Sequence, residues 1–105
     1  MLERDIQHDC VQWVRTEHPD CLVFSVPNEA ARTRSQFFAY SGMSKGAPDL
    51  VVVLPEKVVF VEMKTKKGRV RPEQAEFGEA CASLGVSYHI CRSLEEFQAV
   101  VDTYI

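Results

Sequence analysis

Residues 48–64 read PDLVVVLPEKVVFVEMK, a stretch in which two apolar runs dominate. The runs cover 49–54 and 57–64 and are rich in valine, a β-branched residue that favours strands. Pro55 and Glu56 separate the runs at the position where a turn is expected. The stretch therefore predicts a β-hairpin. Because Pro55 excludes the primed two-residue turns, we expect a slightly looser turn that leaves the pairing parity unchanged.

The register of this hairpin decides which side chains meet. A turn at its centre pairs the two runs residue by residue, and this pairing places Asp49 opposite Glu62. Directly opposed residues have Cβ atoms roughly 5 Å apart. Glu62 and Lys64 share one face of their strand, about 6.5 Å apart, because side chains alternate between faces. The three side chains should therefore converge, unless a β-bulge shifts the register by one residue.

Two carboxylates and a lysine that face one spot are unfavourable as plain structure, because like charges raise each other's pKa unless a cation joins them. Mg²⁺ prefers oxygen ligands, and it can activate water and stabilise charge on phosphoryl oxygens. Lys64 would then orient or help deprotonate the attacking water, or neutralise the pentavalent phosphate. The simpler alternative is a surface ion pair between Lys64 and one of the acids. For an arbitrary hairpin, that alternative is the favoured one.

Helices and strands alternate on either side of the hairpin. Apolar residues recur at helical spacing over 3–17, and a short strand covers 22–26. Pro72 suits the first position of a helix that runs to about residue 84, and Gly85 suits its C-terminal cap. The core stripe of this helix should include Ala75, Phe77, Cys81 and Leu84. A strand over 86–91 and a helix over 94–101, opened by a capping box, complete the chain.

The order α–β–β–β–α–β–α predicts a mixed α/β fold (α+β type) with one mixed sheet flanked by helices. A helical crossover joins the third and fourth strands, so these two should run parallel. With 105 residues, the chain is expected to form one domain, residues 1–105. The four cysteines have no CxxC spacing, which favours buried free thiols over structural zinc. No apolar run approaches the roughly 18 residues of a membrane span, and the N-terminus lacks a signal core, so a cytoplasmic protein is expected.

The net charge of −3 conceals a strong asymmetry along the chain. Residues 32–71 hold nine of the twelve basic residues and three acids, a local net charge of +6. The remainder holds three basic residues and twelve acids, a net charge of −9. A polyanion would therefore meet a basic middle segment. Solvated charge alone can also produce such a split. The positions of the three acids inside the basic segment, Asp49, Glu56 and Glu62, favour a polyanion partner instead.

The residues around the hairpin also match a known pattern. Pro48-Asp49 followed by Glu62-Met63-Lys64 resembles the PD-(D/E)xK nuclease motif. The fuller pattern resembles the VRR-NUC (virus-type replication–repair nuclease) family. That pattern adds Glu3, Gly42, Lys45-Gly46 and Pro72-Glu73-Gln74. The resemblance covers essentially the whole chain, which looks like a stand-alone nuclease domain of the kind found in phages and bacteria.

The resemblance implies a restriction-endonuclease-like core and hydrolysis of DNA phosphodiester bonds that depends on Mg²⁺ or Mn²⁺, with no organic cofactor and no membrane partner. Asp49 and Glu62 would be metal ligands, with the backbone carbonyl of Met63 as a further one. Lys64 would be the catalytic lysine. Glu3 would approach the metal from the first helix, directly or through water.

Gln74 would contact the same site from the second helix. One residue departs from the family pattern, because Arg71 precedes this helix where a capping Ser or Thr is commoner. The departure concerns the start of the helix and not the chemistry. Read without the resemblance, Gln74 is a solvated helix residue, and Glu3 is an acid placed favourably at the N-terminus of a helix.

Bare members of the family are associated with homodimers that cut four-way (Holliday-type) junctions, and larger relatives act on flaps. The resemblance therefore implies a homodimeric junction-resolving endonuclease acting in DNA repair or replication. One alternative is a flap or other branched-DNA nuclease, and another is a non-catalytic module that binds DNA structures on the same fold. A decayed site usually loses one of its key residues, whereas Asp49, Glu62 and Lys64 are all present. A metal-binding regulatory or RNA-processing domain is a weaker third possibility.

Basic residues flank the strands that carry the acids, and contacts to phosphates are favoured over ordinary loop charge. The candidates are Lys45, Lys66, Lys67, Arg69 and Arg71, with Arg32 and Arg34 as weaker ones. The long connection before the hairpin also holds Phe37, Phe38 and Tyr40, which either cover the sheet or form a dimer contact.

Overall fold

The computed structural model describes residues 1–27, 42 and 44–105. Its elements follow the predicted order: α1 (Glu3–Glu17), β1 (Leu22–Ser25), β2 (Leu50–Leu54), β3 (Lys57–Met63), α3 (Pro72–Ser83), β4 (Ser87–Cys91) and α4 (Leu94–Tyr104). The predictions for Arg32, Arg34 and the aromatic residues Phe37, Phe38 and Tyr40 lie outside the described residues.

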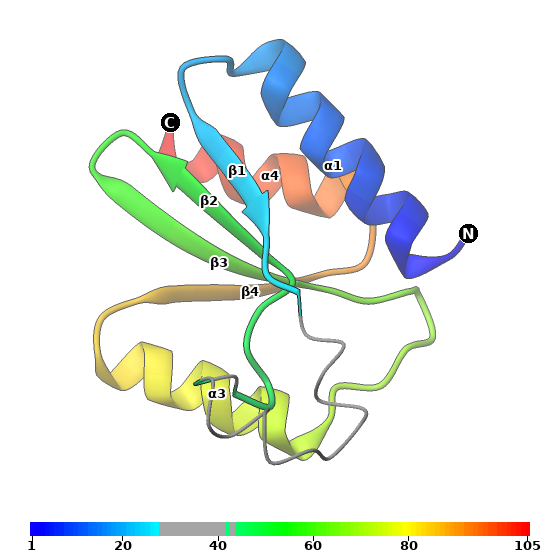
Figure 1. Cartoon of the computed structure of the whole chain (residues 1–105), viewed down its shortest axis with the longest axis vertical. Helices are drawn as coiled ribbons and strands as arrows, with labels where there is room; N and C mark the ends of the chain where they lie inside the picture. Colours follow the sequence, from blue (N-terminus) through cyan, green and yellow to red (C-terminus); the bar gives the residue numbers. More distant parts are fainter. Residues whose placement is uncertain (28–41, 43) are drawn as a thin grey trace.

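The four strands form one mixed sheet in the order β1-β2-β3-β4. β1 pairs with β2 and β2 with β3 in antiparallel fashion, whereas β3 and β4 run parallel. The parallel pair is the one that the helical crossover through α3 predicts. In Figure 1, α1 and α4 lie on one side of the sheet and α3 lies on the other. The predicted mixed sheet flanked by helices is confirmed.

The hairpin has the predicted register but a tighter turn than expected. Leu54 pairs with Lys57 and Leu50 with Val61, so no bulge interrupts the pairing between them. Only two residues form the turn, and Glu56 has a φ of 56°. A proline at the first turn position and a positive φ at the second are the arrangement of a type II turn. The expected looser turn is therefore wrong, because the left-handed conformation of Glu56 closes the hairpin in two residues.

The hydrophobic core lies between one face of the sheet and the pair α1 and α4. Alternate residues of β2 and β3 point into it, as the period of a strand requires. The buried residues of the core are Ile6, Cys10, Val14, Val23, Leu50, Val52, Leu54, Val59, Val61, Met63, Cys91, Phe97 and Val101. Cys10, Cys21, Cys81 and Cys91 are free thiols, and all but Cys21 are buried.

α3 covers the opposite face of the sheet above β3 and β4. Its Phe77 contacts Tyr88 and Phe60, with ring centroids 5.8 Å and 6.4 Å apart. The predicted core stripe is wrong at its two ends, because Ala75 is exposed and Leu84 is 80% exposed. The helix turns a polar residue inward at its first turn in place of Ala75, and Leu84 lies where the chain leaves the helix.

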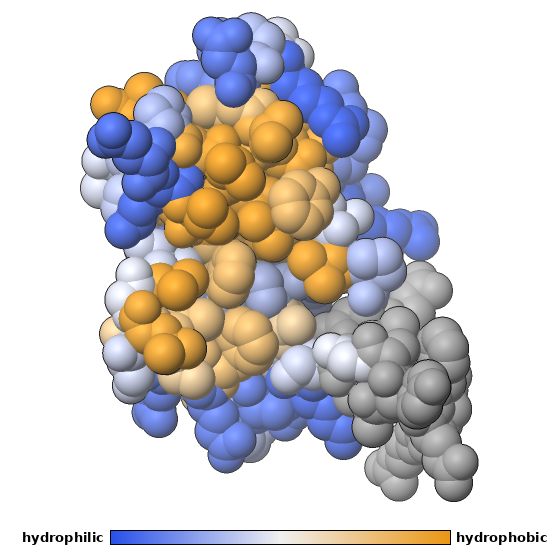
Figure 2. All heavy atoms as spheres, turned by 60° about the vertical axis from the view of Figure 1, so that its left-hand side comes forward, coloured by the Kyte–Doolittle hydropathy of each residue, from blue (hydrophilic) through white to orange (hydrophobic). Residues whose placement is uncertain are grey.

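The half of this second face above β1 and β2 has no helix over it among the described residues. Leu22, Phe24 and Val58 are 63%, 49% and 44% exposed, and the strand register places them on one face with Val53 and Val51. Figure 2 shows apolar side chains gathered on one side of the molecule, with hydrophilic side chains along part of their border. We call these five residues the outer apolar face. None of the helices in the described ranges has the length and apolar character needed to cross a bilayer.

Candidate active site

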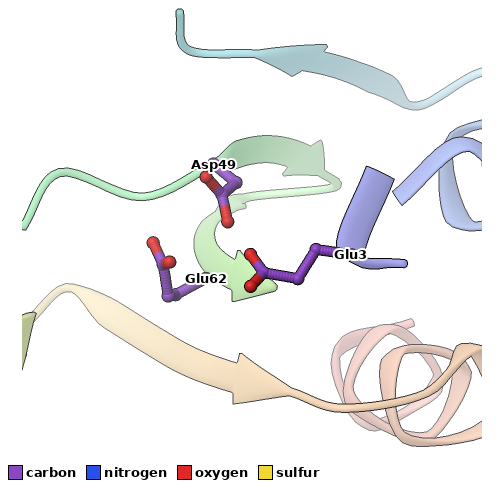
Figure 3. Close-up of side chains that lie close together, drawn as sticks. All are labelled: Glu3, Asp49 and Glu62. Carbon is purple, nitrogen blue, oxygen red and sulfur yellow. The ribbon is translucent and has the colours of Figure 1, made fainter. Parts of the chain in front are cut away.

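Three carboxylates from three elements converge at one end of the hairpin. Asp49 directly precedes β2, Glu62 lies in β3, and Glu3 is the first residue of α1. Each offers an oxygen atom, and these atoms all lie within 4.8 Å of one another. Figure 3 shows the three side chains pointing toward a common point. The strand register explains why Asp49 and Glu62 meet, because they are the next opposed residues after the pair Leu50 and Val61.

Backbone and side-chain hydrogen bonds fix two of these carboxylates. The backbone N–H of Met63 donates to Oδ2 of Asp49 at 2.8 Å. Nε2 of Gln74 donates to Oε2 of Glu62 at 2.8 Å. Bonds of this kind to an ionised acceptor are stronger than neutral ones, and they orient the acceptor. Glu3 is exposed and approaches from the end of its helix.

Gln74 links the site to the start of α3. Its Oε1 accepts a hydrogen bond from the backbone N–H of Arg71 at 2.9 Å, while its Nε2 reaches Glu62. The first bond is one half of a capping box, in which the third helical residue satisfies the N-cap donor. The helix therefore starts at Pro72 without a Ser or Thr at position 71. The polar residue that the helix turns inward is Gln74, which is 8% exposed.

Burial and like charge both act on Glu62, which is 3% exposed. Burial, followed by the charge of Asp49 and a hydrogen bond to it, raises the pKa of Glu62 to about 8, and Glu3 adds to the rise. Lys64 acts in the opposite direction and lowers the same pKa. The cluster therefore favours a positive partner, which is either a bound cation or a proton.

Lys64 extends the site just beyond the end of β3. Its side chain is 5% exposed, and its backbone N–H donates to the carbonyl of Cys91 at 3.0 Å. Its charge is close enough to Glu62 to oppose the rise in the pKa of that carboxyl. The structure thus brings together the predicted residues Asp49, Glu62 and Lys64 at the end of one hairpin.

The donor set fits a hard divalent cation. Mg²⁺ binds carboxylate oxygens at about 2.0–2.1 Å, so ligands on opposite sides of the ion are roughly 4 Å apart. The oxygens of Asp49, Glu62 and Glu3 span up to 4.8 Å. The three carboxylates therefore lie close enough together to supply ligands to one such ion. The exposed Glu3 suits a contact made directly or through a bridging water.

Gly46 explains the Lys-Gly pair that precedes the motif. Its φ is +85°, and a Cβ atom at this position would lie 2.2 Å from the carbonyl oxygen of Glu73. The hydroxyl of Tyr88 donates to the carbonyl of Gly46 at 3.4 Å. The loop that leads to Asp49 therefore lies directly against the first turn of α3. Burial and the charges of Glu62 and Asp49 raise the pKa of Tyr88, which locates this side chain beside the carboxylates.

The predicted phosphate contacts have solvent-exposed side chains. Those in the described ranges are Lys45, Lys66, Lys67, Arg69 and Arg71, all of them exposed. Sequence reasoning missed two residues near the site, Tyr88 and Arg92. The strand pairing offered a signal for Tyr88, which is paired with Phe60 on the face that carries Glu62. The only sequence signal for Arg92 was its position directly after the last strand.

Comparison with known proteins agrees with this fold. The sequence model of the VRR-NUC domain matches residues 2–95. A solved structure described as a VRR_NUC domain protein superposes with a TM-score of 0.82 at 22% identity, covering 100% of this chain and 88% of its own. Another, described as a VRR_NUC domain, superposes with a TM-score of 0.71 at 26% identity, covering 98% and 97%. A comparison with curated proteins finds no significant match.

The fold and the matched sequence model together define the class of this protein as a nuclease domain. The chain belongs to the VRR-NUC family, a family of nucleases that act on DNA.

Proposed function

We propose that residues 1–105 form one metal-dependent DNA endonuclease domain that cuts branched DNA, most of all four-way junctions, as a homodimer. The observation that carries the proposal is the convergence of three carboxylates within 4.8 Å beside a buried lysine. A surface ion pair does not account for this arrangement, because Glu62 is buried next to two further acids. Burial of like charges is unfavourable without a positive partner, and a bound cation lets the carboxylates stay ionised.

The residues take the following roles in this proposal. Asp49 and Glu62 hold Mg²⁺ or Mn²⁺, with Glu3 completing the set and the carbonyl of Met63 as a further ligand. When bound, such an ion acts as a Lewis acid that stabilises negative charge at the reacting phosphodiester. Lys64 orients the attacking water and neutralises charge that develops on the phosphate.

Gln74 and the N–H of Met63 act on the carboxylates and not on the substrate. Each donates to one oxygen, at 2.8 Å in both cases, and so fixes its direction before substrate arrives. A preorganised donor set of this kind avoids a reorganisation cost when charge develops. The exposed basic residues Lys45, Lys66, Lys67, Arg69 and Arg71 contact the phosphate backbone and carry no sequence preference.

The four-way junction is proposed because its symmetry matches that of a two-fold dimer, which presents two active sites to two strands. The outer apolar face supports a dimer, because exposed apolar side chains gathered on one surface are typical of protein–protein contacts. A second copy suits this face because Leu22, Phe24, Val51, Val53 and Val58 carry no charge that would repel their own symmetry mates.

The test is cleavage of labelled four-way junction, flap, single-stranded and duplex DNA in Mg²⁺, Mn²⁺ or EDTA. We expect symmetric cuts in the junction that require metal. Cleavage of the flap alone would keep the chemistry and reject the substrate. Tight junction binding without cleavage in either metal would reject the enzyme and favour a DNA-structure-binding module. Preference for RNA in a binding competition would reject DNA as the substrate.

A further inference from the structure

A single arginine holds the turn that follows Lys64. The turn runs over 65–68 and is closed by a hydrogen bond of 3.0 Å from the N–H of Gly68 to the carbonyl of Thr65. Nη1 of Arg92 donates to the carbonyl oxygens of Thr65 at 2.8 Å and Gly68 at 2.7 Å. It also lies 3.2 Å from the carbonyl oxygen of Lys66. Three of the four carbonyls of the turn therefore face one guanidinium group.

The side chains of this turn are those proposed to meet DNA. Lys66 and Lys67 occupy its two central positions and are both exposed. An isolated exposed turn has many conformations, and its backbone bonds compete with water. Charge-assisted bonds from one guanidinium restrict these conformations, so the two lysines start from a fixed backbone.

Arg92 is itself anchored to the strand that carries the site. It follows Cys91, which pairs with Met63 and whose carbonyl accepts the N–H of Lys64 at 3.0 Å. The backbone N–H of Arg92 donates to Oε1 of Glu96 at 2.8 Å, which ties it to α4 as well. The contacts of its side chain therefore fix the turn relative to Lys64.

We propose that Arg92 is a positioning residue for DNA binding, which holds turn 65–68 so that Lys66 and Lys67 meet the phosphate backbone beside Lys64. The inference rests on the proposed function, because it takes DNA as the polyanion. Lysine is a poor substitute for arginine in this role, since its ammonium group is more strongly hydrated and sits on a flexible stem, whereas the guanidinium group is planar and loses less freedom per hydrogen bond.

The test measures binding of the full chain to a four-way junction in EDTA over a range of salt concentrations. The variants are Arg92→Lys, the double variant Lys66→Ala/Lys67→Ala, and the triple combination. Arg15→Lys, an exposed position at the far end of α1, is the matched control. The slope of log K against log salt counts the phosphate contacts, at about 0.9 per contact.

We expect the lysine double variant to reduce this slope by about 2, and Arg92→Lys to reduce it by about 1 to 2 although the net charge is unchanged. In the background without the two lysines, Arg92→Lys should have little further effect, because both changes remove the same contacts. Arg15→Lys should leave the slope unchanged.

The inference would be overturned if Arg92→Lys kept the wild-type slope. It would also be overturned if Arg92→Lys reduced the slope by the same amount with and without Lys66 and Lys67. A lowered melting temperature with an unchanged slope would do the same and make Arg92 a structural residue only. The lysine double variant tests the inference even if Arg92→Lys folds poorly. An unchanged slope in the double variant would show that Lys66 and Lys67 make no phosphate contacts, so Arg92 would have nothing to position. Binding without metal-dependent cleavage by the wild type would reject the nuclease and leave the role of Arg92 standing. Absence of DNA binding by the wild type would overturn both.

Discussion

Glu62 ties the chemistry of the site to the stability of the protein. Burial, and then Asp49, raise the pKa of this carboxyl from an ordinary 4.5 to about 8. Between these two values the unfolded chain releases the proton while the folded protein retains it. The contribution of Glu62 to metal-free stability is therefore intact below pH 4.5 and is lost as the pH rises to about 8. The loss proceeds at up to about 1.4 kcal/mol per pH unit.

Replacement of Glu62 by Gln should remove this dependence. In EDTA, we expect the melting temperature of the wild type to fall between pH 5.5 and pH 8, and that of Glu62→Gln to fall much less. Added Mg²⁺ should raise the melting temperature of the wild type at pH 8. At one hundred times its dissociation constant, the ion stabilises the folded protein by about 2.7 kcal/mol. Glu62→Gln should gain little stability from Mg²⁺. Glu79→Gln, at an exposed position of α3, is the control. Identical pH profiles for wild type and Glu62→Gln would contradict the interpretation.

The elements of the site are held in place by a close approach of two segments. Gly46 has a φ of +85°, and a Cβ there would meet the carbonyl oxygen of Glu73 at 2.2 Å. The loop before Asp49 therefore depends on glycine twice, for its backbone conformation and for its contact with α3. Gly85 has a similar φ of +76° but open space around its Cβ position. A comparison of alanine substitutions at Gly85 and Gly46 therefore separates the cost of a positive φ from the cost of a steric clash.

Gly46→Ala should be the more damaging of the two substitutions. We expect Gly85→Ala to destabilise the fold by about 1 kcal/mol, the cost of a positive φ in a residue with a side chain. Gly46→Ala should cost about 1–3 kcal/mol beyond that, because a backbone carbonyl must move. Cleavage should fall as well, since the displaced segments carry Asp49 and Gln74. Chemical denaturation of both variants measures the difference, and equal destabilisation would show that the close contact has no effect.

The hairpin was predictable from the sequence because its information is local. The turn residues and the alternation of side chains fix the register, and the register alone brings Asp49 opposite Glu62. The helix and strand order follows from patterns that span about ten residues. The tight turn was missed because sequence reasoning gave Glu56 no reason to adopt a positive φ.

Features that depend on packing between distant elements were not predictable in the same way. Residue patterns gave Glu3 and Gln74 plain roles, and only the family resemblance placed them at the site. The inward face of α3 was misjudged at its ends because Gln74 turns toward Glu62 in the first turn of the helix and Leu84 lies where the chain leaves it. The contacts of Arg92 require knowing that the turn after β3 folds back over the end of β4.

At the scale of the whole molecule, the outer apolar face should decide the oligomeric state. We expect the wild type to be a dimer at micromolar concentration, and Phe24→Glu to be a folded monomer. Burial of a Phe side chain contributes about 1.5–3 kcal/mol, so losing one on each subunit weakens the dimer by roughly 10²–10⁴-fold. Sedimentation equilibrium measures the mass. Ile105→Glu, at the exposed apolar residue that follows α4 on the other side of the sheet, should remain dimeric. A dimer that survives Phe24→Glu would place the interface elsewhere.

Cleavage of a labelled four-way junction by wild type, Lys64→Ala and Lys57→Ala, in Mg²⁺ and in EDTA, tests the nuclease site most directly. Lys57 lies on the same strand at the opposite end from the carboxylates, so its replacement removes an equal charge without touching the site. We expect wild type and Lys57→Ala to cut only with Mg²⁺, and Lys64→Ala to be slower by about 100-fold or more while binding the junction. Cleavage by Lys64→Ala at the wild-type rate, or cleavage in EDTA, would contradict a metal-dependent site built on Asp49, Glu62 and Lys64.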